Sequence, residues 1–392
     1  MKTISDKIFY VGVNDTDKTL FEGLWPLPYG ISYNSYMIVD EKVALIDTVE
    51  RAFEYDFIEN IRQAAPGRTI DYLIVNHMEP DHSSLISYVL GRYPDLKVVA
   101  SAKALPMLAG YHSVPEERVI AVADGEILSL GTCTLSFHMV PMVHWPETMV
   151  TWVEEENTVF TGDAFGTFGA VEEDMTDTGR TLDKYRNEMV RYYSNVIGKY
   201  GKPVQSAIAK MSFFDVHRIC STHGPIWENE VAEVVSLYDW LSRGETERGV
   251  CIAYGSMYGN TARAAQALAA ELQKAGVPYA IHDLVGCLGL SDAIRDAFRY
   301  DTIVVGSPTY NNGIFPPVGA FMDALQSRLV TGRRFYAFGS YTWSGTSVNL
   351  LNTWAAGMGF ELLGGGLSFP QAYTAEKCDM AAVAKTIIRT SR

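Results

Sequence analysis

The stretch Val75–Ser84, "VNHMEPDHSS", brings four possible metal ligands together within six residues: His77, Glu79, Asp81 and His82. It follows the apolar run "TIDYLIV", which predicts a buried β-strand. Functional side chains are often carried by loops that a rigid strand positions. The stretch therefore predicts a metal site at the end of a strand.

Three more possible ligands lie downstream. His144 occurs in "PMVHWPE", Asp163 in "VFTGDAFG" and His223 in "ICSTHGP", each after a strand-like run. The complete set supplies four imidazoles and three carboxylates, which is too many ligands for one four-coordinate zinc ion. The pattern indicates two ions, each with three ligands of its own, and one shared bridge.

This pattern resembles the metallo-β-lactamase superfamily, whose hydrolases carry H-x-H-x-D-H followed by His, Asp and His. Glu79 stands here in place of the second histidine of that motif. A carboxylate hardens the site and favours iron or manganese over zinc. Carboxylates also bind zinc, so a zinc site stays open at this point.

The second part of the chain alternates apolar strands with amphipathic helices, beginning at "GVCIAYGS" and ending with "EKCDMAAVAKTIIRT". This alternation predicts a doubly wound parallel sheet. The polar segment Leu241–Val250 separates it from the mixed α/β pattern of the first part. We therefore expect two domains, residues 1–248 and residues 249–392.

Three loops of the second domain follow predicted strands. The first, Ser256–Thr261, opens a helix, and its hydroxyls, amide and backbone N–H groups suit a terminal phosphate. The loop matches neither G-x-x-x-x-G-K-[ST] nor G-x-G-x-x-G, which disfavours a P-loop and a dinucleotide-binding site. The other two loops, Gly306–Pro316 and Gly339–Gly345, carry aromatic residues that suit a flat ring.

The second domain resembles a flavodoxin, and the ligand that this resemblance implies is FMN. Trp343 is the residue expected to cover the isoalloxazine ring. The residues expected to bind FMN are Ser256, Met257, Tyr258, Gly259, Asn260, Thr261, Pro308, Thr309, Tyr310, Asn311, Asn312, Gly313, Ser340, Tyr341, Thr342, Trp343, Ser344 and Gly345.

An iron-type metallo-β-lactamase-like domain joined to a flavodoxin resembles the flavodiiron proteins, also called A-type flavoproteins or rubredoxin:oxygen oxidoreductases. The resemblance implies an αββα sandwich followed by the flavodoxin-like sheet. It implies two non-haem irons and one FMN per chain. One iron takes His77, Glu79 and His144, the other takes Asp81, His82 and His223, and Asp163 bridges them. Tyr192 and Tyr193 are expected near the site.

The family implies reduction of dioxygen to water, of nitric oxide to nitrous oxide, or both, with electrons passing through FMN. It also implies a head-to-tail homodimer or a dimer of dimers, in which the FMN of one subunit lies beside the irons of the other. The chain carries no C-x-x-C motif of a rubredoxin. The expected electron donor is therefore a separate rubredoxin or a reduced deazaflavin.

Composition limits the other function classes. The net charge of −14 disfavours nucleic-acid binding, and no run of about 18 apolar residues is present to span a membrane. The N-terminus has no secretory leader pattern, and the five cysteines form no disulfide framework, so we expect a cytoplasmic protein with free thiols. The alternatives are a zinc hydrolase that carries a flavodoxin domain and a non-catalytic electron-transfer flavoprotein.

Overall fold

The computed structural model describes residues 1–171, 175–286 and 289–389. The chain forms two compact units. The first comprises Met1–Gly23, Leu27–Tyr193 and Tyr200–Ser242, and the second comprises Leu24–Pro26, Ser194–Lys199 and Arg243–Arg392. The main division thus comes after Ser242 rather than after residue 248, and two short segments of the first part of the sequence belong to the second unit.

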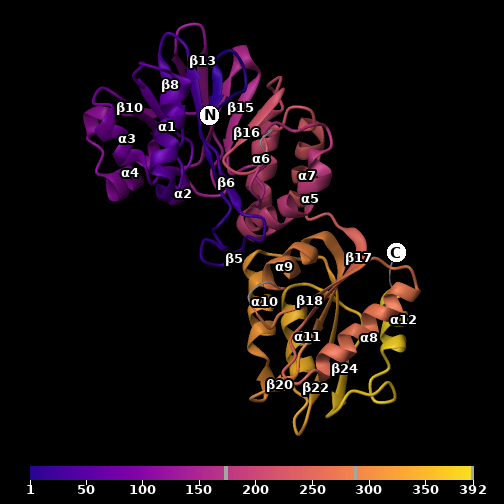
Figure 1. The fold of residues 1–392 in the computed structure, drawn as a ribbon. Helices are drawn as coiled ribbons and strands as arrows, with labels where there is room; N and C mark the ends of the chain where they lie inside the picture. Colours follow the sequence, from indigo (N-terminus) through magenta and orange to yellow (C-terminus); the bar gives the residue numbers. More distant parts are fainter. Residues whose placement is uncertain (172–174, 287–288, 390–392) are drawn as a thin grey trace. The chain divides into compact units, whose positions relative to one another are not determined.

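The first unit contains a seven-stranded sheet, shown in indigo and purple in Figure 1. Its first four strands are antiparallel neighbours, and the remaining three continue in parallel. In spatial order the strands are β1 (Lys2–Thr3), β2 (Ile8–Tyr10), β7 (Tyr36–Val39), β8 (Val43–Ile46), β9 (Tyr72–Val75), β10 (Lys97–Ser101) and β11 (Val119–Val122).

A five-stranded sheet faces the first one. Its strands are antiparallel neighbours except for the last pair, which is parallel. In order they are β12 (Ile127–Ser129), β13 (Thr134–Met139), β14 (Met149–Val153), β15 (Thr158–Gly162) and β16 (Arg218–Ser221). A smaller ribbon pairs β3 (Val13–Asp15) with β6 (Ile31–Tyr33), and β4 spans Leu20–Phe21.

The hydrophobic core of the first unit lies between these two sheets. Ile38, Ile46 and Ile74 of the first sheet join one buried cluster with Phe137 and Phe160 of the second. Each strand has alternate side chains on opposite faces, so one face of each sheet is left for helices to cover. The result is the predicted αββα sandwich.

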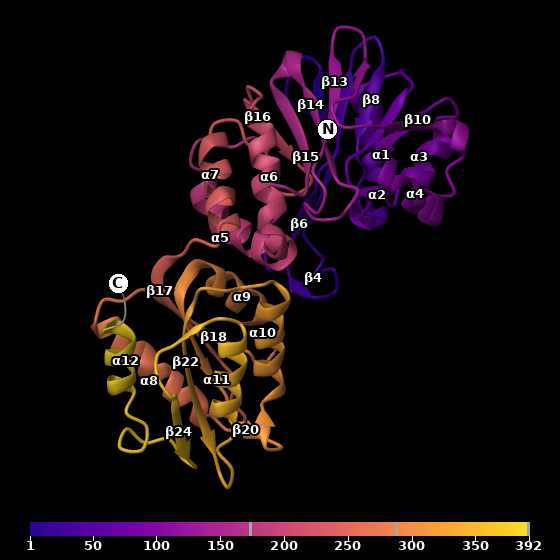
Figure 2. The same ribbon diagram turned by 180° about the vertical axis from the view of Figure 1, so that it is seen from behind.

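Helices cover the outer faces of the sandwich (Figure 2). On the side of the first sheet they are α1 (Glu54–Ala64), α2 (Pro80–Ser83), α3 (Ile86–Arg92) and α4 (Leu105–His112). On the side of the second sheet they are α5 (Thr181–Tyr192), α6 (Gly201–Met211) and α7 (Val231–Ser242). Among the described residues, no helix has the length and apolarity needed to cross a membrane.

The second unit is a parallel sheet in the order β18–β17–β19–β22, with β23 and β24 both pairing with β22. This is the predicted doubly wound arrangement. Its strands are β17 (Glu247–Tyr254), β18 (Tyr279–Asp283), β19 (Tyr300–Gly306), β22 (Arg334–Tyr341), β23 (Glu361–Leu362) and β24 (Leu367–Pro370). The unit also holds a ribbon of β20 (Thr309–Tyr310) and β21 (Gly313–Ile314), and β5 (Trp25–Pro26), which pairs with β4, is assigned to it.

Five helices flank this sheet. In Figure 1, α8 (Asn260–Lys274) and α12 (Met380–Arg389) lie on one side of it, and α9 (Gly289–Arg299), α10 (Pro316–Ser327) and α11 (Ser347–Gly357) lie on the other. The alanine-rich α8 buries one apolar face against the sheet. It ends before Gly276, whose φ of 67° favours glycine at this left-handed position.

The described cysteines Cys133, Cys220, Cys251 and Cys378 are free thiols and buried. The fifth, Cys287, lies outside the described residues.

Candidate metal centre and flavin site

Every predicted metal ligand of the first unit lies where a strand gives way to a loop or short helix. His77 and Glu79 follow β9, and α2 then carries Asp81 and His82. Asp163 follows β15, and His223 follows β16, the parallel neighbour of β15. His144 lies in the loop between β13 and β14. The sandwich therefore brings strand ends from both sheets to one place.

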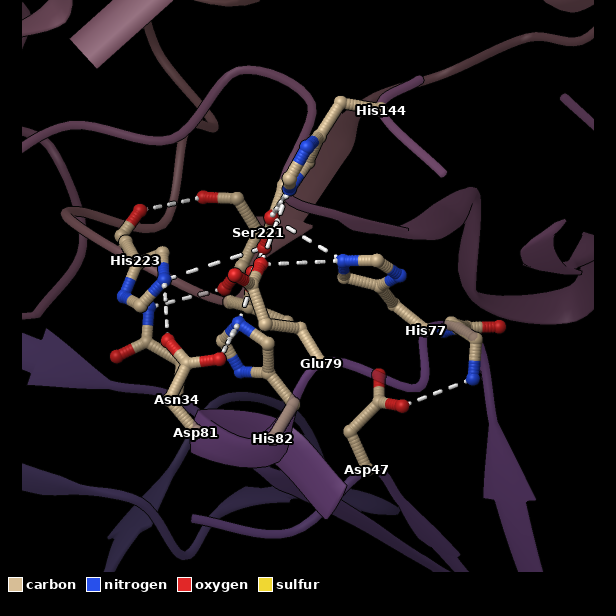
Figure 3. A network of polar contacts seen from close by, with 12 residues as sticks. Asn34, Asp47, His77, Glu79, Asp81, His82, His144, Ser221 and His223 are labelled. Atoms are coloured by element: carbon tan, nitrogen blue, oxygen red, sulfur yellow. Dashed lines mark hydrogen bonds and ion pairs between the residues drawn. The ribbon is translucent and has the colours of Figure 1, made fainter. Parts of the chain in front are cut away.

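The first of two groups contains His77, Glu79, His144 and Asp163. His144 Nε2 lies 3.0 Å from Glu79 Oε2 and 3.0 Å from Asp163 Oδ2. His77 Nε2 lies 3.3 Å from the same Glu79 oxygen. Four ligand atoms thus converge within a space that suits one metal ion. Figure 3 shows three of these side chains, His77, Glu79 and His144, pointing toward one another.

The second group contains Asp81, His82 and His223. His82 Nε2 lies 3.3 Å from Asp81 Oδ1, and His223 Nε2 lies 3.3 Å from Asp81 Oδ2. Asp163 reaches this group as well, because its Oδ1 lies 3.0 Å from His82 Nε2. The two oxygens of Asp163 thus face different groups, as the bridge of a two-metal site requires.

The site is almost closed to solvent. His77, His82, Asp163 and His223 have no exposed surface, and the other three residues are at most 8% exposed. Several of their polar atoms have no hydrogen-bond partner of acceptable geometry among the described residues, namely both carboxylate oxygens of Asp81, Asp163 Oδ2, His82 Nε2 and His223 Nε2. Buried polar atoms are rarely left without partners. Their convergence fits a pair of bound cations.

The electrostatics of the site agree with this fit. Burial disfavours a charged imidazole, but the carboxylates of Asp81 and Asp163 outweigh it and raise the pKa of His82 to about 9. The nearby carboxylates of Asp163 and Glu79 likewise overcome burial and raise the pKa of His144 to about 9. Burial also opposes ionisation of Asp163, yet the surrounding imidazoles hold its pKa well below the usual range. The ligand set thus attracts positive charge, which a metal ion would supply in place of protons.

Three contacts orient the ligands from behind. Buried Glu147 accepts a hydrogen bond from His77 Nδ1 at 2.9 Å through its Oε1. His223 Nδ1 donates to the carbonyl oxygen of Ser32 at 2.7 Å. Thr222 Oγ1 donates to Asp163 Oδ1 at 2.6 Å. Such contacts fix which ring nitrogen faces a metal.

The sequence interpretation missed these three supporting residues. A single Glu in "HWPETMV", a Ser carbonyl and a Thr have no spacing pattern of their own. Only Thr222 could have been suspected from the sequence, because it directly precedes the predicted ligand His223.

The two predicted tyrosines differ in position. Tyr192 is fully buried, and its ring centroid lies 5.5 Å from that of His223. Its hydroxyl has no hydrogen-bond partner among the described residues. Burial, reinforced by the carboxylates of Asp163 and Glu79, raises its pKa far above the usual value. Tyr193 packs edge-on against Tyr238 at 5.2 Å. Tyr192 is therefore the tyrosine that contacts the ligand cluster.

In the second unit, a cavity of about 370 Å³ opens at the carboxyl ends of β17, β19 and β22. This volume is in the range of small-molecule sites. The lining residues are Ser256, Met257, Tyr258, Asn260, Thr261, Pro308, Thr309, Tyr310, Asn311, Asn312, Ser340, Tyr341, Thr342, Trp343, Ser344 and Gln371. All three predicted loops thus meet around one cavity.

The loops differ from the sequence expectation at four positions. Gly259, Gly313 and Gly345 are not among the residues that line the cavity. Gly259 instead caps α8 with a φ of 82°. Gln371, which follows β24, lines the cavity and was not predicted. The N–H of Gln371 donates to the Tyr341 carbonyl oxygen at 2.7 Å, so its position depends on the pairing of β24 with β22 in the assembled sheet.

The chemistry of the cavity suits a phosphate and an aromatic ring. It includes no Lys or Arg among its described lining residues. An anion there would be held by hydroxyls and by the N-terminal N–H groups of α8. The side chains of Thr261 and Ser340 lie 3.0 Å apart and link two of the loops. Trp343, 85% exposed at the rim, is free to stack on a flat ligand.

Comparison with known proteins supports both units. The family model described as "ODP family beta lactamase" matches residues 31–224, and the flavodoxin model matches residues 252–382. The anaerobic nitric oxide reductase flavorubredoxin of Pectobacterium carotovorum is 30% identical over 365 residues, which are 91% of this chain and 72% of that protein.

Solved structures match the whole chain. The rubredoxin oxygen:oxidoreductase of Desulfovibrio gigas has a TM-score of 0.93 at 28% identity and covers 99% of this chain and 98% of its own. The flavodiiron protein of Giardia intestinalis has a TM-score of 0.92 at 25% identity, covering 99% of this chain and 97% of its own. The chain therefore belongs to the flavodiiron protein family, in which a β-lactamase-like domain is joined to a flavodoxin domain.

Proposed function

We propose that this chain is a flavodiiron oxidoreductase that reduces nitric oxide to nitrous oxide, dioxygen to water, or both, with electrons delivered through FMN. The observation that carries the proposal is the position of Asp163, whose two carboxylate oxygens face two separate groups of buried ligands. A hydrolase with a single zinc ion has no use for seven such ligands.

Two irons are the metals that fit the donor set best. His77, Glu79 and His144 would hold one, Asp81, His82 and His223 the other, and Asp163 would bridge them. Three carboxylates offset most of the charge of two divalent ions, and their hard oxygens favour iron over zinc. When bound, the irons supply the redox chemistry and adjacent positions for a diatomic gas.

The residues of the chain supply geometry, exclusion of water and proton control. Glu147 and the Ser32 carbonyl keep the Nε2 atoms of His77 and His223 directed at the centre. Burial keeps the site dry, which strengthens every electrostatic interaction in it. Two nitric oxide molecules take two electrons and two protons to give nitrous oxide and water. Tyr192, buried beside His223, is a phenol that could donate a hydrogen bond there.

FMN would occupy the cavity of the second unit. Its phosphate suits the N-terminus of α8 at Ser256–Thr261, and its ring suits the space between the loops that carry Tyr310 and Trp343. The names of the relatives, a nitric oxide reductase flavorubredoxin and a rubredoxin oxygen:oxidoreductase, support both gases as substrates. They also support rubredoxin as donor ahead of a reduced deazaflavin.

The remaining parts of the proposal concern assembly and location. A head-to-tail homodimer, or a dimer of such dimers, would bring the FMN of one subunit to the irons of its partner. The proposed compartment is the cytoplasm. A strictly monomeric protein with full activity would contradict the assembly.

The decisive experiment is anaerobic purification followed by metal and flavin analysis and gas-electrode turnover. We expect about two irons and one FMN per chain, and consumption of at least one gas with reduced rubredoxin. The Asp163→Asn variant should lose iron while keeping its FMN. Zinc without iron, together with thioester or lactam hydrolysis, would instead establish the hydrolase alternative. Iron-loaded protein that consumes neither gas would favour a non-catalytic flavoprotein.

A further inference from the structure

An amine and a thiol meet at one end of the sandwich in the first unit. Lys7 directly precedes β2 of the seven-stranded sheet, and Cys133 directly precedes β13 of the five-stranded sheet. The two residues are 126 positions apart in the chain, yet Lys7 Nζ donates to Cys133 Sγ at 3.6 Å. The pair therefore joins the two sheets through a side-chain contact.

Asp40 fixes this contact from a third strand. It directly follows β7, and its Oδ2 accepts hydrogen bonds from the backbone N–H groups of Thr132 and Cys133 at 2.7 and 2.6 Å. Asp40 Oδ1 lies 3.5 Å from Lys7 Nζ, and Lys7 also donates to the Thr132 hydroxyl. One carboxylate thus holds both the lysine head group and the turn that carries the cysteine.

The two partners differ in exposure. Cys133 has no exposed surface and belongs to the hydrophobic core between the sheets, whereas the Lys7 side chain is 30% exposed. Burial raises the pKa of the Cys133 thiol, and the Lys7 ammonium opposes this shift only in part. Since thiol reactivity follows thiolate character and exposure, the sulfur is protected from large reagents and from rapid oxidation. A small oxidant that reaches it beside Lys7 finds the lysine nitrogen already in contact.

From this geometry we propose that Lys7 and Cys133 form a reversible covalent crosslink, in which one oxygen atom bridges Nζ and Sγ. The oxidant is dioxygen. The crosslink goes beyond the proposed function, because it uses neither the metals nor the flavin.

The reaction consumes one dioxygen molecule and releases one water molecule. The S–H bond, one N–H bond of the neutral amine and the O–O bond break, while an S–O and an N–O bond form. Sulfur and nitrogen each give up two electrons, and the second oxygen atom leaves as water with the two hydrogens. Two dithiol molecules reverse the reaction. They supply four electrons and four protons, become disulfides, and release the bridging oxygen as water.

The crosslink would brace the sandwich that carries the metal ligands. It closes a long loop of the chain, from Lys7 to Cys133. Closing a loop of this kind restricts the unfolded chain more than the folded one, which stabilises the fold. Dioxygen would therefore make the first unit more resistant to unfolding, and dithiols would undo the effect.

Peptide mass analysis tests the crosslink directly. Iron- and FMN-loaded protein is purified anaerobically, and half of it is kept in air-saturated buffer. Both halves are then unfolded in an alkylating reagent and digested with trypsin without reductant. After air exposure we expect no cleavage after Lys7, and we expect its peptide to be joined to the peptide of Cys133. The joined mass should exceed the sum of the separate peptides by one oxygen atom less two hydrogen atoms, and dithiothreitol should separate them. Unjoined peptides after air exposure, or a join without the added oxygen, would overturn the inference.

Two lysine variants test the role of the crosslink as a brace. Lys7→Arg keeps the positive charge beside Asp40 and should lose the crosslink. Lys210→Arg is the matched control, because Lys210 pairs with Asp124 instead, and it should crosslink as the wild type does. After air exposure we expect the Tm of the first unit to be roughly 5 °C or more higher in the wild type and in Lys210→Arg than in Lys7→Arg. Samples kept anaerobic should not show this difference. The same mass change in Lys7→Arg would refute the assignment of the nitrogen, and equal Tm values after air exposure would refute the brace. Neither readout depends on gas consumption, so each stays separate from a failure of the proposed function.

Discussion

Glu147 offers the sharpest test of how the first ligand group is held. Its carboxylate is 2% exposed and accepts two hydrogen bonds, from His77 Nδ1 at 2.9 Å and from the backbone N–H of Met78 at 3.0 Å. Burial opposes ionisation of this carboxyl, but the contacts with His77 outweigh it and lower the pKa of Glu147. A charged acceptor therefore lies behind a predicted metal ligand.

The Glu147→Ala change leaves two buried donors without an acceptor. Each costs about 1–3 kcal/mol, so the free energy of unfolding should fall by about 2–6 kcal/mol. Loss of such a contact behind a metal ligand typically weakens metal binding by about 10–100-fold, or about 1.4–2.7 kcal/mol. Glu147→Gln keeps one acceptor oxygen but loses the charge. We expect Glu147→Gln to weaken iron binding by about tenfold, and to lower the free energy of unfolding less than Glu147→Ala does.

The assay is iron content per chain during anaerobic titration with a chelator, alongside urea unfolding of the same samples. Glu154→Ala is the matched control, since Glu154 is an exposed glutamate directly after β14. FMN content should not change in any of these variants. Iron affinity in Glu147→Ala equal to that of the wild type would refute the reasoning that this carboxylate supports the site.

Three further predictions concern metal choice, flavin binding and acid stability. Glu79→His should shift the metal found after purification from iron toward zinc, because it replaces a hard oxygen with an imidazole; elemental analysis reads this out. Trp343→Ala should weaken FMN binding about two- to tenfold through loss of about 0.5–1.5 kcal/mol of stacking, whereas Phe213→Ala, at an exposed aromatic far in sequence from the cavity loops, should not. For buried Asp296, burial opposes ionisation, but hydrogen bonds from His282 and a neighbouring arginine outweigh it and lower the pKa below the ordinary 3.8. Its stabilising effect is therefore fully present above that value and is lost as the pH falls below about 4 and through the lowered pKa, so Asp296→Asn should flatten the loss of unfolding free energy in that acidic range.

The seven candidate ligands could be picked out from the sequence because metal ligands come from few residue types and follow strands. His77, Asp163 and His223 are far apart in the chain, yet each occupies the same structural position at a strand end. Strand ends in facing sheets converge. The spacing of His77, Glu79, Asp81 and His82, together with the strand-end position of the other candidates, was therefore enough to predict one shared site. The folds of both units were predicted from the order of strands and helices in the sequence. The clearest pattern was the strict alternation of strands and helices in the second unit.

Two features could not be predicted from the sequence, because they depend on which distant segments pack together in the folded chain. Glu147 supports His77 only because the loop before β14 passes behind β9, where Met149 N donates to the Asn76 carbonyl at 3.0 Å. Ser194–Lys199 belongs to the second unit, where Arg328 donates to the carbonyl oxygens of Ser194 and Asn195 at 2.9 Å each. The local sequence of that segment cannot show a contact with an arginine more than a hundred residues away.

The two ligand groups are not equivalent, and this difference has a measurable consequence. Behind the first group stands a carboxylate, Glu147, bonded to His77, whereas a neutral carbonyl, that of Ser32, supports His223 in the second. A charged acceptor makes its imidazole a stronger ligand than a neutral one does. Since Asp163 is shared, it cannot account for any difference between the groups. We therefore expect a chelator to remove iron in two steps, with the ion of the first group released last, and the Glu147→Ala change to merge the two steps. Anaerobic Mössbauer spectra recorded during the titration would resolve the two ions, and a single step in the wild type would show that the Glu147 carboxylate makes no difference to iron binding.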